Sequence, residues 1–101
     1  MLTSKQRAQL RGLAATEDTI VHIGKGGITD NIITQMSDAL KARELVKGRV
    51  LEHSLLTARE ACDALAETCR AEPVQVIGSK FVLYKRNEQK PKIELVKKAK
   101  K

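Results

Sequence analysis

Apolar positions along the chain follow a helical period in three segments and a strand-like period in four. The helices are expected over residues 3–14, 29–43 and 54–72, and the strands over residues 19–23, 44–51, 74–77 and 81–85. Residues 78–80 separate the last two strands and give a hairpin signal. The order α-β-α-β-α-β-β predicts an α+β fold, an α/β sandwich in which three helices pack on one small sheet.

Threonines are expected to begin the first two helices. Thr3 and Gln6 have the Thr-x-x-Gln spacing of a capping box, in which each side chain accepts a backbone N–H of the other residue. Thr29 stands directly before the second helix, and Asp30 places a negative charge near the positive end of that helix dipole.

The third helix is expected to begin at Ser54 and to bury one stripe of its surface. Ala58, Cys62, Leu65 and Cys69 recur at the spacing of a single helix face. In a helix the Cα atoms of the two cysteines are roughly 10 Å apart, which is too far for an unstrained disulfide. Both cysteines are therefore expected to be free core residues, as is usual in a reducing compartment.

The second strand carries two cations on one side. Lys47 and Arg49 alternate with Val46 and Val50, so the two charged side chains are expected to share a solvent-facing side of the sheet. Gly48 between them weakens the strand, because glycine has no side chain to pack.

Only two aromatic residues are available to the core of this 101-residue chain, whose length suits a single domain. Phe81 and Tyr84 have opposite parity in the last strand, so one of them is expected to pack in the core. They do not supply the stacking platform of an RRM domain. No segment approaches the ~18 apolar residues of a membrane span, and the first residues do not form a signal peptide. A cytoplasmic protein without a membrane partner is expected.

Positive charge is concentrated near the end of the chain. Residues 1–79 hold ten basic and ten acidic residues, whereas residues 80–101 hold nine basic and two acidic ones, which accounts for the net charge of +7. Residues 1–15 and 45–51 carry basic residues without acids, while residues 52–72 carry five acids against two arginines. This segregation predicts a basic side for a polyanion and an acidic side turned away from it. The alternative is a solubilising tail on an ordinary domain.

A Gly24-Lys25-Gly26-Gly27 turn connects the first strand to the second helix. Glycines allow the backbone to approach a phosphate closely, and exposed N–H groups at a helix start attract anions. The spacing fits neither the P-loop nor the dinucleotide fingerprint, which needs glycine where Thr29 stands. What remains is Gly-x-x-Gly, the form that clamps single-stranded backbone in KH domains. Taken alone, the loop fits a glycine-rich connection without a ligand equally well.

No group of side chains predicts catalysis, a metal site or a cofactor. His22, His53, Cys62 and Cys69 lack the short paired spacing of structural zinc sites. No serine, cysteine or histidine is placed as a nucleophile with its base. His22 lies in an apolar strand and is expected to be a hydrogen-bonded packing residue.

Several motifs occur together and in order. They are Lys5-Gln6 with Leu10-Arg11-Gly12-Leu13-Ala14, Ile23-Gly24-Lys25-Gly26-Gly27-Ile28-Thr29, Arg43-Glu44-Leu45-Val46-Lys47, Val74-Gln75-Val76-Ile77-Gly78 and Val82-Leu83-Tyr84-Lys85. In these motifs the chain resembles the CRM-domain family (chloroplast RNA splicing and ribosome maturation), and the resemblance extends over residues 2–86. The resemblance is to its stand-alone bacterial, YhbY-like type.

The resemblance implies a four-stranded mixed sheet, similar to the C-terminal domain of a bacterial translation initiation factor. It also implies RNA binding through the glycine loop and adjoining basic residues, and association with precursors of the large ribosomal subunit. Residues 1–86 are expected to form a CRM-like RNA-binding domain, and residues 87–101 a flexible, Lys-rich tail. Gly48 stands where relatives usually carry a β-branched residue, which puts the regularity of the second strand in question.

The sequence thus predicts a non-catalytic, monomeric RNA-binding protein that holds rRNA backbone during large-subunit assembly. The candidate RNA-binding residues are Gly24, Lys25, Gly26, Gly27, Ile28, Thr29, Lys5, Arg11, Lys47, Arg49, Lys80, Lys85 and Arg86. One alternative is a protein-interaction module of the translation machinery with little RNA affinity. Another is a binder of duplex DNA, although no helix is basic enough to read a major groove.

Overall fold

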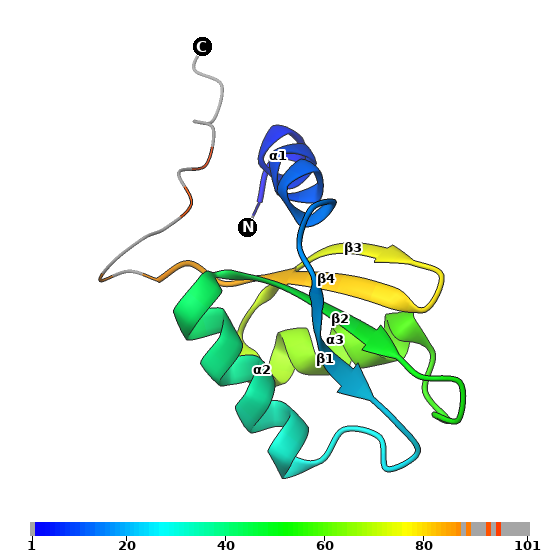
Figure 1. Cartoon of the computed structure of the whole chain (residues 1–101). Coiled ribbons are helices and arrows are strands. Elements are labelled where there is room, and N and C mark those ends of the chain that lie inside the picture. Colours follow the sequence, from blue (N-terminus) through cyan, green and yellow to red (C-terminus); the bar gives the residue numbers. More distant parts are fainter. Residues whose placement is uncertain (1, 88, 90–92, 94, 96–101) are drawn as a thin grey trace.

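A computed structural model describes residues 2–87, 89, 93 and 95, and it shows one sheet between two helical layers (Figure 1). Helices α2 and α3 cover one face of the sheet, and α1 lies on the other. The elements are α1 (Ser4–Ala14), β1 (Thr19–Ile23), α2 (Asp30–Arg43), β2 (Leu45–Val50), α3 (Ala58–Cys69), β3 (Glu72–Ile77) and β4 (Lys80–Tyr84).

The sheet is mixed, with strand order β1-β2-β4-β3. β1 and β2 are parallel, and β4 is antiparallel to both β2 and β3. The predicted α+β architecture, with three helices and a four-stranded mixed sheet, is confirmed. β3 begins at Glu72 rather than at Val74, so it includes Pro73, which an edge strand tolerates.

Each face of the sheet has its own apolar core. Val21, Ile23, Phe81 and their neighbours pack against α2 and α3. Leu10 and Tyr84 belong to the second cluster, on the α1 side. Because helices cover both faces, Phe81 and Tyr84 are both buried, although only one of them was expected in the core. Tyr84 is therefore not available to stack on a base.

Helix starts follow local capping chemistry. The Thr3–Gln6 capping box and the Thr29 cap are confirmed. The start predicted for the third helix at Ser54 is wrong, because α3 begins after Thr57. The Thr57 hydroxyl accepts the Glu60 N–H at 3.1 Å and the Glu60 carboxylate accepts the Thr57 N–H at 2.9 Å. Ser54 instead accepts the Leu56 N–H within the preceding turn.

Gly48 does not interrupt β2. The strand pairs continuously with β4 from Leu45 to Arg49, and Gly48 lies opposite Phe81. A Cβ at position 48 would stand 2.4 Å from the Phe81 Cζ atom, so the glycine makes room for the ring. The irregularity in this part of the sheet falls in β1, between Thr19 and Val21.

The buried stripe predicted for α3 is confirmed, and both of its cysteines are free thiols inside the core. Burial, with a smaller contribution from the nearby negative charge of Asp63, raises the pKa of Cys62 from 9.0 to about 11. Burial also raises the pKa of Cys69.

A buried glutamate joins the end of the domain to the residues that follow it. The Glu44 carboxylate accepts the Asn87 N–H at 2.6 Å and the Ile93 N–H at 2.7 Å. Ile93 and Leu95 also pack against the α1-side cluster. Most of the residues 87–101, for which flexibility was predicted, lie outside the described residues, namely 88, 90–92, 94 and 96–101.

Candidate nucleic-acid interface

The Gly24–Gly27 turn closes on itself just beyond the end of β1. The Gly27 N–H donates to the Gly24 carbonyl at 3.0 Å, and Gly27 has a φ of +72°, which a glycine adopts without strain. Thr29 then caps α2 by accepting the Ile32 N–H at 3.2 Å. The short connection therefore delivers the chain to the N-terminus of α2 with its backbone fixed.

Part of the loop backbone remains unpaired. Lys25, Gly26 and Thr29 are exposed, and their N–H groups have no acceptor among the described residues. The Gly27 N–H is not available to a ligand, because it donates to the Gly24 carbonyl. Free amides beside a helix N-terminus and a lysine form a local environment suited to an anion.

The segment between β2 and α3 forms one wall of the loop. The Leu51 N–H donates to the Ile23 carbonyl at 2.8 Å. Ideal Cβ positions at Gly24 and Gly27 would lie 3.8 Å from Leu51 and 4.0 Å from Leu56. In the same segment Leu55 is 93% exposed.

A row of exposed side chains, here called the cation row after its members Arg49 and Lys80, begins beside the loop and crosses the sheet on its α1 side. His22 pairs with Arg49 across β1 and β2, Arg49 pairs with Lys80 across β2 and β4, and Lys80 pairs with Ile77. All four side chains are exposed. Because Gly24 follows β1 directly, this row and the loop occupy the same end of the sheet (Figure 1).

His22 was not expected in this row. Its neighbours Val21 and Ile23 are buried against α2 and α3, so strand alternation points His22 to the opposite side, where it is exposed. The prediction that it is a hydrogen-bonded packing residue is wrong, because its side chain is exposed. The alternation of the three residues was the sequence signal that could have placed it.

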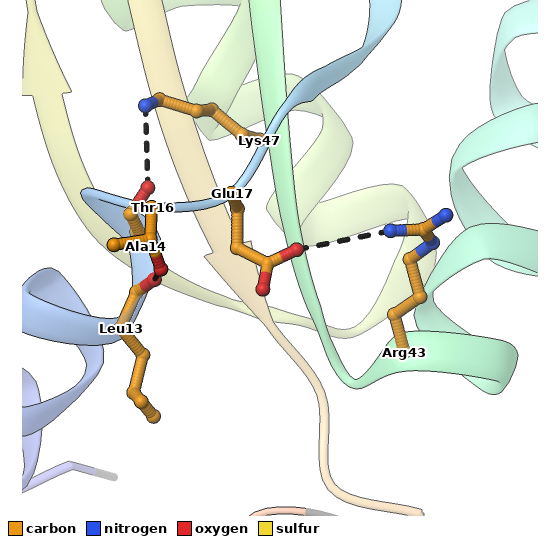
Figure 2. A network of polar contacts seen from close by, with 6 residues as sticks. All are labelled: Leu13, Ala14, Thr16, Glu17, Arg43 and Lys47. Atoms are coloured by element: carbon orange, nitrogen blue, oxygen red, sulfur yellow. Dashed lines mark hydrogen bonds and ion pairs between the residues drawn. The ribbon is translucent and has the colours of Figure 1, made fainter.

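Lys47 lies behind the cation row on the same side of β2, as its spacing from Arg49 predicted. It is half-buried rather than fully solvated, because its Nζ atom donates to the Ala14 carbonyl at the end of α1, 3.2 Å away (Figure 2). Arg11, in the last turn of α1, lines the same hollow as Lys47 and Lys80.

The end of α1 is held in place by contacts of the chain that follows it (Figure 2). The Thr16 hydroxyl donates to the Leu13 carbonyl at 3.1 Å, and Glu17 forms a 3.7 Å ion pair with Arg43. The ion pair is exposed and contributes little by itself. The bond from the Lys47 Nζ atom to the Ala14 carbonyl connects this last turn of α1 directly to the sheet.

The remaining predicted site residues lie at the other end of the sheet. Tyr84 pairs with Leu45 at the start of β2, and the Lys85 N–H donates to the Glu44 carbonyl. Lys85 and Arg86 line a hollow there with Leu2, just before α1, and the exposed Lys5 follows in the first turn of that helix. The structure therefore does not bring Lys5, Lys85 and Arg86 together with the glycine loop.

Exposed acids lie on the other side of the molecule. Glu60, Asp63 and Glu67 are exposed on α3, which covers the sheet face opposite α1. Among the described residues no ion pair engages Arg49, Lys80 or Arg11. These three acids thus lie on the opposite side of the fold from Arg49, Lys80 and Arg11, whereas Glu72 lines the hollow that contains Lys85 and Arg86.

The part of the chain that the structure describes contains no group of three or more His, Cys, Asp or Glu residues placed to hold a metal ion. None of its helices is long and apolar enough to span a membrane.

Comparisons with known proteins agree with this architecture. A model of the CRS1 / YhbY (CRM) domain matches residues 2–85. A Bacillus subtilis protein named "Probable RNA-binding protein YqeI" is 42% identical over 95 residues, which cover 94% of this chain and 99% of that protein. A Haemophilus influenzae protein named "RNA-binding protein" is 33% identical, with 96% and 97% covered.

A solved structure shares both sequence and fold. The solution structure of SAV1595 from Staphylococcus aureus has a TM-score of 0.72 and 45% identity, covering 95% of this chain and 100% of that one. The family model spans all of the helices and strands described above. The chain belongs to the CRS1 / YhbY (CRM) domain family.

Proposed function

We propose that this protein is a non-catalytic RNA-binding protein whose glycine loop holds RNA backbone. The observation that carries the proposal is the pair of free amides at Lys25 and Gly26, beside the N-terminus of α2 and at the same end of the sheet as Arg49 and Lys80. Phosphate oxygens accept from such amides and are attracted by the cations. The names of the Bacillus and Haemophilus relatives support RNA as the ligand.

The RNA contacts are proposed to involve two regions. The main region comprises the loop residues Gly24 to Thr29, including Ile28, with Arg49, Lys80, Lys47 and Arg11 beside it. Lys5, Lys85 and Arg86 form a second, separate basic region at the far end of the sheet, which a longer RNA reaches. Each phosphate contacted on a single strand adds about 0.7 to the slope of log affinity against log salt concentration.

A negative charge added to the loop tests this assignment. Gly26 has no positive φ, and a Cβ there would meet only the Thr29 methyl group at 3.8 Å, so Gly26→Asp is compatible with the fold. The new carboxylate would repel a phosphate at the free amides, and we expect weaker binding of single-stranded RNA in a gel-shift assay at fixed salt.

The matched control is Ala64→Asp, which adds the same charge at an exposed position of α3 on the opposite side. It should leave RNA affinity nearly unchanged. Equal affinity of Gly26→Asp and the unaltered protein would exclude the loop from RNA binding. Absence of salt-dependent RNA binding by the unaltered protein would favour a protein-interaction module of the translation machinery instead.

The cellular target is proposed to be rRNA in precursors of the large ribosomal subunit, which the protein binds as a monomer in the cytoplasm. Sedimentation of a cell lysate on a sucrose gradient tests this assignment. The protein should migrate with large-subunit particles, and treatment with RNase should release it. Migration only at the top of the gradient, with or without RNase, would contradict a ribosomal target.

A further inference from the structure

The uncovered part of the sheet next to α1 contains a groove with an apolar base and a cationic rim. Its volume is about 280 Å³, just below the ~300–1,000 Å³ of typical small-ligand pockets. Val82 lies in the base and is 2% exposed, whereas Ile77 forms a wall and is 62% exposed. An apolar hollow of this size suits one flat ring system rather than a protein segment.

The polar groups of the groove are suited to a nucleotide. Arg11, Lys47 and Lys80 line it, and none of the described lining residues is acidic. Lys47 uses one N–H on the Ala14 carbonyl and retains two further donors. Gln75, which is half-buried on the same wall, carries an amide that both donates and accepts.

We propose that this groove holds one unpaired base of the RNA, a site that deepens the proposed function and rests on it. The base lies on Val82 and against Ile77, the guanidinium plane of Arg11 stacks on it, and the Gln75 amide bonds to its edge. Lys47 and Lys80 contact the phosphates on either side. A base within a duplex cannot enter, because its faces are stacked and its edge is paired.

The groove and the glycine loop can engage one RNA strand. Lys80 lines the groove and also belongs to the row His22–Arg49–Lys80, which begins next to Gly24. Neighbouring strands are ~4.8 Å apart, so the row from β1 to β4 spans ~10 Å. The loop then fixes the backbone, and the groove favours RNA with an accessible base beside the clamped phosphates.

The test fills the groove without changing charge. Ala15 is an exposed lining residue at the end of α1, and Ala15→Phe places a ring in the space assigned to the base. Ala8→Phe makes the same change at an exposed position of α1 that does not line the groove. The probes are a single-stranded RNA oligomer, its blunt duplex, and an abasic ribose–phosphate chain of the same length.

For the unaltered protein we expect the intact single strand to bind roughly tenfold more tightly than the abasic chain, a difference typical of one base contact. Ala15→Phe should remove that difference while leaving duplex affinity and the salt slope unchanged. Ala8→Phe should behave as the unaltered protein. Lys80→Ala should weaken the binding of all three probes, since it removes a phosphate contact.

Two results would overturn the base site. One is an Ala15→Phe protein that still prefers the intact strand to the abasic chain. If Gly26→Asp weakens RNA binding in the same assay, the proposed function is retained and the base site alone is excluded. The other is equal affinity of the unaltered protein for intact and abasic chains. If the unaltered protein binds no RNA at all, the proposed function fails together with the base site.

Nuclear magnetic resonance of the unaltered protein gives a second measurement that does not depend on any variant. The side-chain amide signals of Gln75 and the methyl signals of Ile77 should shift with intact RNA and stay unchanged with the abasic chain. Identical shifts of the Gln75 and Ile77 signals with both probes would also overturn the base site. The same holds if these signals shift with neither probe while the signals of the glycine loop do.

Discussion

Gly48 and Phe81 face each other across β2 and β4, and the ring occupies the space above the glycine. Gly48→Ala would put a methyl group 2.4 Å from the Phe81 Cζ atom, inside a buried cluster. Overpacking of this kind should lower the free energy of unfolding by about 1–3 kcal/mol. Urea denaturation of the variant measures the loss.

Gly12→Ala is the matched control, since nothing lies within 4 Å of a Cβ at that position of α1. The same change should there raise the free energy of unfolding by ~0.5–1 kcal/mol, through helix propensity. Phe81→Leu combined with Gly48→Ala should cost less than the sum of the two single changes. A Gly48→Ala protein as stable as the unaltered one would contradict the close packing described for these residues.

Cys62 makes the stability of the protein depend on pH at the alkaline end. Its pKa is raised to about 11 in the folded protein, so the folded state binds the thiol proton more tightly than the unfolded state does. This contribution to stability is complete below pH 9 and is lost as the pH rises from about 9 to about 11, by ~1.4 kcal/mol per unit. Urea denaturation of the unaltered protein and of Cys62→Ala between pH 8 and pH 11 should give a steeper decline for the former.

The same thiol should be unreactive in the native state. At pH 8 a thiol reagent should label Cys62 and Cys69 only after urea unfolds the chain, because both are protonated and buried. Rapid labelling of the native protein at that pH would contradict the buried, neutral state.

At the scale of elements, the start of α3 is determined by capping hydrogen bonds at Thr57 and not by the apolar spacing that had suggested Ser54. Thr57→Ala removes a cap and one half of the reciprocal pair with Glu60, and should lower the free energy of unfolding by about 0.5–2 kcal/mol. Ser54→Ala removes only a turn contact to the Leu56 N–H and should cost much less. Thermal unfolding of the two variants measures the difference, and a larger loss for Ser54→Ala would reverse the assignment.

Most elements could be predicted because their signals are local. Thr3 with Gln6, the stripe of α3 and the alternation around Gly48 each concern residues close together in the chain. Thr57 with Glu60 carries the same type of signal as Thr3 with Gln6, and the apolar residues that precede it obscured it. A helix starts at whichever of several nearby capping residues forms its hydrogen bonds. Apolar periodicity alone does not identify that residue.

At the scale of the whole molecule, the candidate site was harder to predict than the fold, because strand register decides it. The run of positive charge near the end of the chain contains both Lys80 and Lys85, which register places at opposite ends of β4. Of these two lysines, Lys80 lies with Arg49 beside the glycine loop and Lys85 does not. Gln75 and Ile77 carry no charge, and the family motif that contains them does not say which side chains line a groove, so the sequence did not mark them as a site.

Glu44 ties the domain to the residues beyond β4, and its contacts join positions far apart in the chain. Its buried carboxylate accepts the N–H groups of Asn87 and Ile93. Removing residues 87–101 takes those donors from a buried carboxylate, and bonds to charged groups are worth about 1.5–3 kcal/mol each. We expect the free energy of unfolding of the shortened protein to be lower by at least about 2 kcal/mol. The urea concentration at which half of it is unfolded should fall accordingly.

A double-mutant cycle with Glu44→Ala identifies the carboxylate as the cause, since residues in direct contact are not additive. Glu44→Ala should destabilise the full chain more than the chain shortened after Arg86, because in the shortened protein two of its bonds are already lost. The packing of Ile93 and Leu95 on the α1-side cluster contributes separately, and Leu95→Ala measures it with Glu44 intact. Additive losses for Glu44→Ala and the truncation would show that Glu44 does not hold this part of the chain.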